Sequence, residues 1–145
     1  MKVLAVILLS LLCAGVAHAD TYGSLAVYKG GNKVSEASGG SVYRVDTGSY
    51  DSMRVRMRFR DVTADGWGTY ARALQDAWDC TPSGCSWLRM NNDESNKYGT
   101  ADGWRTTYLT EGRPWELGYR SNPNVCHHEP WYDPDDCDSA GWVRP

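Results

Sequence analysis

The stretch MRVRMRFR, from Met53 to Arg60, alternates apolar and basic side chains with a period of two. Because successive side chains of a β-strand point to opposite faces of a sheet, this period predicts a strand with one buried and one solvated face. The apolar row should face the core, since burying a row of arginines would cost far more free energy. The predicted buried row is Met53, Val55, Met57 and Phe59, and the predicted solvated row is Arg54, Arg56, Arg58 and Arg60.

The rest of the chain also has the composition of an all-β protein. Tyr, Trp, Val and Thr are frequent, and clusters of Gly, Asn, Asp and Ser recur between them at turn-like intervals. About seven strands are predicted, which fits a single antiparallel two-sheet sandwich of Ig-like type. Two segments are less regular in this prediction. Residues 73–78 have a helical turn as an alternative, and the chain from Asn122 onward should run irregularly over the surface.

The N-terminal segment predicts export. Lys2 precedes a short apolar run, and Ala17-His18-Ala19 matches an A-x-A cleavage site, so residues 1–19 are expected to be a signal peptide. The apolar run is too short to span a bilayer. Leu12 precedes Cys13 at a position where a lipidation signal needs a small residue. We therefore expect a secreted, extracellular protein without a membrane anchor, in which residues 20–145 form one β-sandwich domain.

Four cysteines follow the predicted cleavage site. An even number of cysteines in a short exported chain predicts disulfide bonds. Two local bonds are favoured among the three possible pairings, Cys80–Cys85 across the turn-forming TPSG and Cys126–Cys137 across HHEPWYDPDD. A zinc site made from the same cysteines and the neighbouring histidines is the alternative, but the oxidising compartment and the missing C-x2-C spacing disfavour it. We expect neither a metal nor a cofactor.

The charge distribution limits what the arginine row can bind. The chain has a net charge of −3, with an excess of basic side chains in residues 20–72 and of acidic ones in residues 73–145. A general nucleic-acid binder would be strongly basic, so no nucleic acid partner is expected. Three interpretations of the row remain open. The arginines can pair with acids on neighbouring strands, bind an acidic protein partner, or bind a polyanion such as a glycan sulfate.

Candidate catalytic residues are few. His127 and His128 are the only histidines after the signal peptide, and no G-x-S-x-G nucleophile elbow accompanies them. No pair of acids stands out as the carboxylates of a glycosidase. We expect that the chain is not an enzyme. The acidic loop from Asp133 to Asp138 has calcium binding through its carboxylates as an alternative to a plain solvated loop.

Seven tryptophans exceed what the core of one small sandwich usually holds. Some should therefore be exposed, where a tryptophan ring suits either glycan stacking or a protein contact. Trp131 and Trp142 are the candidates, because both lie in the Pro- and Asp-rich C-terminal segment.

Two further segments have competing interpretations. The pentapeptide TADGW occurs at 63–67 and again at 100–104. It is interpreted as a hairpin turn that occurs twice. The alternatives are a turn whose carboxylates, Asp65 and Asp102, bind calcium, and two related binding lobes. Residues 20–28 are hypothesised to be an edge strand or a free arm that carries part of a partner interface, including Leu25 and Val27. The alternative is an ordinary first strand paired within the domain.

The run RDVTADGWGTYARA and the ending VCHHEPWYDPDDC resemble small exported proteins of actinobacteria, which have an ADG turn before an aromatic-rich strand and end in a disulfide loop. One such group is the small adaptor subunit of secreted umbrella-shaped antibacterial toxin particles, linking a lectin-like subunit to a long toxin stalk. The resemblance implies a non-enzymatic protein–protein adaptor in a secreted assembly. The alternatives are a secreted enzyme inhibitor, with loop 81–84 or 127–136 entering a protease site, and a glycan-binding module.

Overall fold

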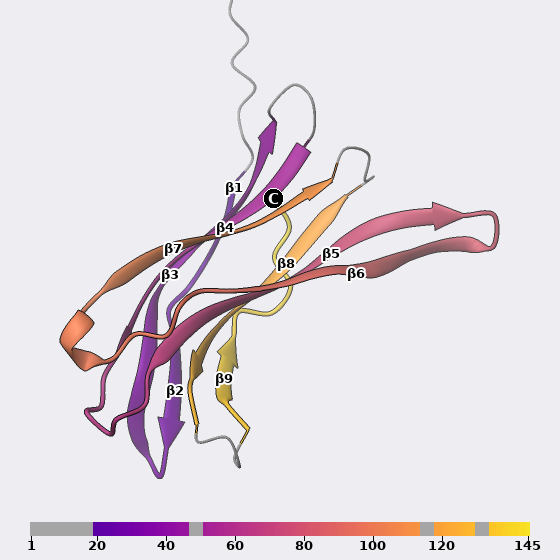
Figure 1. Ribbon diagram of the computed structural model, residues 1–145. Helices are drawn as coiled ribbons and strands as arrows, with labels where there is room; N and C mark the ends of the chain where they lie inside the picture. Colours follow the sequence, from indigo (N-terminus) through magenta and orange to yellow (C-terminus); the bar gives the residue numbers. More distant parts are fainter. Residues whose placement is uncertain (1–18, 47–50, 114–117, 130–133) are drawn as a thin grey trace, which may run out of the picture.

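The computed structural model of the chain describes residues 19–46, 51–113, 118–129 and 134–145 (Figure 1). Most of the predicted signal peptide, residues 1–18, lies outside them. The described residues form two antiparallel sheets, which confirms the predicted two-sheet sandwich. One sheet contains β1 (Ala19–Tyr22), β2 (Leu25–Lys29), β3 (Asn32–Asp46), β4 (Asp51–Asp61) and β7 (Arg105–Arg113). The other contains β5 (Thr69–Thr81), β6 (Gly84–Glu94), β8 (Tyr119–His127) and β9 (Asp136–Ser139), and a 3-10 turn, η1 (Thr100–Asp102), precedes β7.

The strand order is that of an immunoglobulin-type sandwich. The first sheet has the order β1-β3-β4-β7, with β2 also paired to β3, and the second has the order β6-β5-β8-β9. From β3 onward this corresponds to the A-B-E and C′-C-F-G arrangements of that architecture. Among the described residues no helix is both long and apolar enough to cross a membrane.

The alternation in β4 is confirmed. Met53, Val55, Met57 and Phe59 are all fully buried, and they belong to a hydrophobic core to which both sheets contribute. The opposing sheet supplies small side chains at several of its core positions. Ala71, Ala73 and Ala77 of β5 leave room for the large side chains of β4, which is how two sheets with unequal side chains fill one interior.

Two predictions about local structure are wrong, and one alternative is excluded. Residues 20–28 do not form one strand, because the pairing is interrupted at Gly23 and Ser24 between β1 and β2. Residues 73–78 are part of the strand β5, which excludes the alternative of a helical turn. The segment after Asn122 continues as β8, in which Val125 and Cys126 are fully buried between β5 and β9. The asparagines and the proline of this segment do not favour a strand, but β8 forms because it is paired with β5 on one side and with β9 on the other.

Two adjacent glycines let the long strand β3 serve two partners. Its register shifts between Ala37 and Gly40, and Gly39 has a φ of +89°, which favours glycine. A Cβ at Gly40 would lie 2.1 Å from the carbonyl oxygen of Arg56, so only glycine fits there. The Tyr22 hydroxyl donates a hydrogen bond of 3.0 Å to the same oxygen and so links β1 to β4 across β3.

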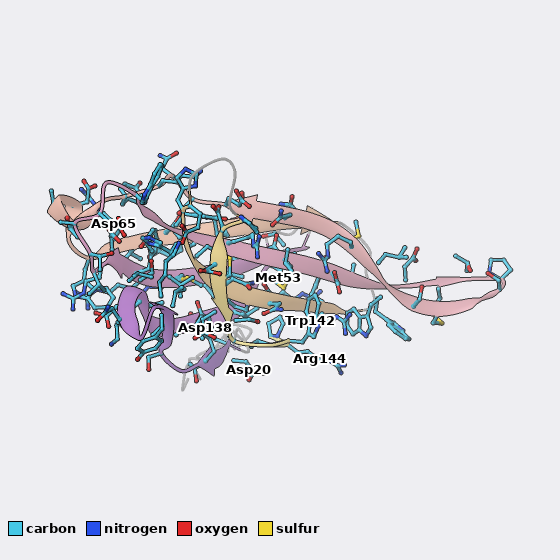
Figure 2. All side chains as sticks on the ribbon, turned by 90° about the horizontal axis from the view of Figure 1, so that it is seen from below. Asp20, Met53, Asp65, Asp138, Trp142 and Arg144 are labelled. Carbon is cyan, nitrogen blue, oxygen red and sulfur yellow. A yellow bond between two sulfur atoms is a disulfide. The ribbon has the colours of Figure 1, made fainter. Side chains whose placement is uncertain are left out.

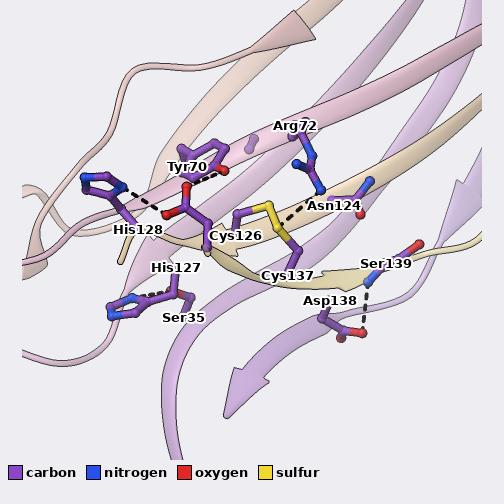
Figure 3. The surroundings of a disulfide bond; sticks show 12 residues. Ser35, Tyr70, Arg72, Asn124, Cys126, His127, His128, Cys137, Asp138 and Ser139 are labelled. Atoms are coloured by element: carbon purple, nitrogen blue, oxygen red, sulfur yellow. Dashed lines mark hydrogen bonds and ion pairs between the residues drawn. A yellow bond between two sulfur atoms is a disulfide. The ribbon is translucent and has the colours of Figure 1, made fainter. Parts of the chain in front are cut away.

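Both predicted disulfides are confirmed, and each joins residues that face each other across two paired strands. Cys80–Cys85 closes the end of the β5–β6 hairpin, and Cys126–Cys137 ties β9 to β8 (Figure 3). Figure 1 shows that the β5–β6 hairpin projects well beyond the other strands.

Candidate partner-binding face

The solvated face of β4 forms a basic surface, which we call the arginine face: Arg54, Arg56, Arg58 and Arg60. Arg56 and Arg58 are exposed, and the other two are half-buried. β4 lies between β3 and β7, so the register of these strands decides what surrounds each arginine. The residues paired with the first three are hydroxyl-bearing and not acidic: Ser41, Tyr43, Thr106, Tyr108 and Thr110.

Arg60 is the arginine of this face that the structure pairs with an acid. Its Nε donates a hydrogen bond of 2.6 Å to Oε1 of Glu36, which lies opposite it on β3. Glu36 also accepts a hydrogen bond of 2.9 Å from Lys33. The hydrogen bond from Lys33, supported by Arg60 and opposed by burial, holds the pKa of Glu36 below its usual value. The predicted cross-strand pairing is therefore confirmed for Arg60.

The other three arginines have no carboxylate within ion-pair distance in the described part of the chain. The Nε atom of Arg54 is buried and has no hydrogen-bond partner there. The guanidinium of Arg58 instead lies over the Trp104 ring, 4.9 Å from its centroid, and Arg60 lies 4.7 Å from the same ring. Tyr108, opposite Arg56, is 54% exposed. The face therefore presents uncompensated positive charge beside aromatic rings.

The outer face of the other sheet also carries arginines, and two of these, Arg89 and Arg120, share one acid, whereas Arg72 contacts the disulfide sulfur of Cys137 instead. Asp76 is buried on β5, and it accepts hydrogen bonds of 2.6 Å from Arg89 Nε and 2.8 Å from Arg120 Nη2. The Arg120 guanidinium also lies 4.0 Å from the ring centroid of Trp142. Trp142 is 41% exposed, and it lies near Arg144 in Figure 2. The prediction that Trp142 is exposed is therefore confirmed. Trp131, the other predicted exposed tryptophan, lies outside the described residues.

Leu25 and Val27 are not on the surface. Both side chains are buried in the core, and β2 is paired with β3 along its length. The backbone N–H of Ala26 donates a hydrogen bond of 2.9 Å to Oδ2 of Asp138 on β9, which holds β2 from its other side. The hypothesis of a free arm that presents Leu25 and Val27 is therefore wrong for β2. The edge-strand alternative fits β1, which is the outermost strand beyond β3.

A buried polar network lies between the sheets, and no pattern in the sequence predicted it. Ser35 Oγ of β3 lies 3.1 Å from His127 Nδ1 of β8 (Figure 3), and His127 Nε2 lies 3.1 Å from Oδ2 of Asp65. The three residue types match a hydrolytic triad. Ser35 and His127 are both buried, and the Ser35 hydroxyl faces the interior between the sheets. The geometry serves to link the two sheets through hydrogen bonds.

The acids of the C-terminal loop are also used internally. Asp135 accepts hydrogen bonds of 2.7 Å from the Tyr70 hydroxyl and 2.8 Å from the backbone N–H of Glu129. Burial opposes ionisation of Asp135, but these donors and His128 outweigh it and hold its pKa below the usual value. The described residues contain no group of three or more His, Cys, Asp or Glu side chains placed to hold a metal ion, and Asp133 lies outside them.

Fold and surface together define this chain as a disulfide-linked β-sandwich in which three arginines of one face have no carboxylate partner among the described residues. Comparison of the chain with protein-family models, with curated proteins and with solved structures finds no match. Function therefore has to be inferred from the geometry of the chain itself.

Proposed function

We propose that the chain is a secreted, non-enzymatic binding module that holds an acidic protein partner on its arginine face. The observation that carries this proposal is the set of three arginines without a carboxylate neighbour in the described part of the chain, beside Trp104 and Tyr108. Guanidinium groups bind carboxylates through two parallel hydrogen bonds. Arginine and aromatic residues are also enriched where protein partners meet.

The assembly proposed for this module is of the secreted antibacterial toxin type, with the chain as an adaptor between larger subunits. Support comes from the resemblance of RDVTADGWGTYARA and VCHHEPWYDPDDC to small exported actinobacterial proteins. The two disulfides are compatible with an oxidising, extracellular location. The edge strand β1 supplies a further contact surface, because its outer main-chain groups can pair with a strand of another protein.

The double variant Arg56→Glu with Arg58→Glu tests the proposal. Poly-L-glutamate serves as a defined acidic polypeptide, and the partner itself is sought by co-purification from the medium of the native source. Reversing two charges should weaken both associations by about tenfold or more, because the charges then repel the acidic partner. The melting temperature should remain close to that of the wild-type protein, since both side chains are exposed.

The matched control is Lys97→Glu with Arg144→Glu, which changes the net charge equally at exposed positions outside the arginine face. It should retain wild-type binding to within about twofold, because a screened surface charge acts mainly at short range. Equal losses in both double variants would overturn the assignment to the arginine face. Retention of the wild-type protein on heparin or DNA columns at physiological salt would contradict a protein partner and indicate that the arginine face binds a polyanion.

A second candidate function, enzyme inhibition, is favoured by the end of the β5–β6 hairpin. Residues 79–86 at this end are exposed, and the Cys80–Cys85 disulfide holds them in a closed loop. The hairpin that carries the loop projects from the body of the sandwich (Figure 1). The Thr81 hydroxyl donates a hydrogen bond of 3.2 Å to the carbonyl oxygen of Gly84 inside this turn. A preformed loop loses little conformational entropy when it enters a protease cleft. Inhibition of secreted proteases by the wild-type protein, absent when Thr81, Pro82 and Ser83 are replaced by glycine, would support this function.

A further inference from the structure

The two TADGW sequences, 37 positions apart in the chain, form the walls of one pocket. This open pocket has a volume of about 330 Å³ and is lined by Asp61, Thr63, Ala64, Gly66, Trp67, Gly99, Thr100 and Ala101. Asp65, beside it, lies at the end of the sandwich opposite the β5–β6 hairpin tip (Figure 2).

The two copies have different local structures, so the interpretation as one hairpin turn used twice is wrong. In the first copy, Asp65 Oδ1 accepts a hydrogen bond of 3.0 Å from the backbone N–H of Trp67. In the second copy, η1 forms a 3-10 turn in which Asp102 Oδ2 accepts a hydrogen bond of 3.0 Å from the backbone N–H of Gly99. The copies share a glycine at positive φ, Gly66 at +87° and Gly103 at +61°, and each places a Thr-Ala pair against the same pocket.

Asp61 is the charged residue among those that line the pocket, and it is incompletely paired. Its side chain is 1% exposed. Oδ1 accepts a hydrogen bond of 3.2 Å from the Thr69 hydroxyl, but Oδ2 has no hydrogen-bond partner among the described residues. A buried carboxylate oxygen without a donor costs free energy, and such an atom in a folded protein calls for a missing partner. Burial correspondingly raises the pKa of Asp61.

The chemistry of the walls restricts what that missing partner is. No lysine or arginine is among the described lining residues. The negative charge of Asp65 lies close to that of Asp61, and His127 is the basic group near both, 3.8 Å from Asp61 and 3.1 Å from Asp65. Trp67 is 40% exposed at the rim of the pocket. A carboxylate with an aromatic ring beside it attracts a cation through both charge and the ring face.

We propose that this pocket binds a primary ammonium group on an alkyl chain, as found on a lysine side chain, with Asp61 as its counter-charge and Trp67 as its aromatic wall. The alkyl chain would lie against Ala64, Ala101 and the threonine methyl groups, and the ammonium would donate to Asp61 Oδ2. The pocket lies outside the arginine face, so this inference does not rest on the proposed function.

The direct test is a titration of the 15N-labelled protein, observed by NMR, with Nα-acetyl-L-lysine methylamide and with n-butylamine. The control ligand is Nα-acetyl-L-norleucine methylamide, which has a similar alkyl chain without the ammonium. Both amines are expected to shift the amide signals of Gly66, Trp67, Gly99 and Thr100, and the control ligand is not. Comparison of their affinities shows whether the pocket prefers an ammonium group on a peptide or on a free alkylamine. Equal shifts with the control ligand, or no shifts with either amine, would overturn the proposal.

Variants assign the binding to the named residues. Asp61→Asn removes the charge but keeps an oxygen for Thr69, and it should weaken amine binding by about tenfold or more. Asp102→Asn is the matched control, because Asp102 belongs to the second copy and is not among the described lining residues. Its affinity should stay within about twofold of the wild-type value, as expected for a screened charge outside the pocket. If Asp61→Asn does not fold, the test uses Trp67→Ala, which changes an exposed side chain and should also weaken amine binding. An unchanged affinity for the amines in that variant would overturn the proposed site.

Discussion

Arginine lies on both outer faces of the sandwich, and the two faces differ in what surrounds it. On the β6-β5-β8 face, Arg89 and Arg120 share the carboxylate of the buried Asp76. On the β3-β4-β7 face, Arg56 and Arg58 are exposed and have no carboxylate partner in the described part of the chain. The first set stabilises the sheet that carries it. The second set adds charge without a carboxylate partner among the described residues, which is the condition expected of a surface that meets another molecule.

The aromatic residues follow the same division. Trp142 packs against the guanidinium groups of Arg89 and Arg120, at 5.6 and 4.0 Å from its ring centroid, and both of these are already bound to Asp76. Trp104 packs against Arg60, at 4.7 Å, and Arg58, at 4.9 Å. Arg60 is bound to Glu36, but Arg58 has no carboxylate partner among the described residues. Both arginines at Trp142 are therefore bound to an acid, whereas at Trp104 only one of the two is.

The largest effect is expected from removing the shared acid. Asp76→Asn should lower the free energy of unfolding by about 2 kcal/mol, because two charged hydrogen-bond donors lose their common acceptor. Glu36→Gln on the arginine face is the control, and it should cost only about 0.5 kcal/mol because the Glu36 side chain is 16% exposed, against 5% for Asp76, and its partners are partly exposed. Urea unfolding of both variants measures the difference. Equal losses would mean that the two faces are equally compensated.

Removing one tryptophan from each face should separate stability from binding. Trp142→Ala should lower the free energy of unfolding by about 1 kcal/mol, since it removes ring contacts with two arginines, and should leave binding to poly-L-glutamate unchanged. Trp104→Ala is expected to weaken that binding, because it releases Arg58 from its fixed position. If Trp142→Ala weakened binding as strongly as Trp104→Ala, the partner would also contact the other sheet.

The acid on the arginine face predicts a pH dependence. The pKa of Glu36 is lower in the folded protein than its usual value of 4.5, so its pairing stabilises the protein above that pH. This contribution should be lost as the pH falls through the lowered pKa, because protonation removes the charge that Lys33 and Arg60 bind. The stability difference between wild type and Glu36→Gln, about 0.5 kcal/mol at neutral pH, should therefore vanish in acid. A difference that grew on acidification would contradict the pairing.

The smallest effect has the opposite sign. Arg56→Gln should raise the free energy of unfolding by a few tenths of a kcal/mol, roughly the size of one cross-strand charge effect, since it relieves repulsion from Arg54 and Arg58. The gain should disappear in high salt, which screens exposed charges. Thermal melts at two salt concentrations measure it. A marked loss of stability would instead show that Arg56 has a structural partner.

Prediction from sequence was most successful where the signal was local. The period-two alternation from Met53 to Phe59 identified both faces of β4, because strand geometry alone decides on which face each side chain lies. Both disulfides were predicted from short spacings and turn residues. Prediction failed at Asn122 to His127, whose polar residues gave no alternation although pairing with β5 and β9 makes the segment a buried strand.

The candidate sites were predictable only in part. The arginine face was found from the sequence, but Leu25 and Val27 were assigned to an interface and lie in the core. The sequence pattern of hydrophobic residues in a terminal strand is the same whether these side chains contact a partner protein or pack in the core of their own domain. The exposed Trp67 was missed, because neither its neighbours in sequence nor the TADGW repeat reveals which turn closes over a pocket.

The sequence by itself determined that the chain is all-β and which side of β4 carries the arginines, and it favoured the disulfide pairing that the structure then confirmed. The tertiary structure decided which arginines have acids beside them. Arg120 reaches Asp76 from 44 positions away, and Arg60 reaches Glu36 from 24. The physical reason is that alternation and turns act over a few residues, whereas charge compensation depends on strand order and register, which bring distant positions side by side.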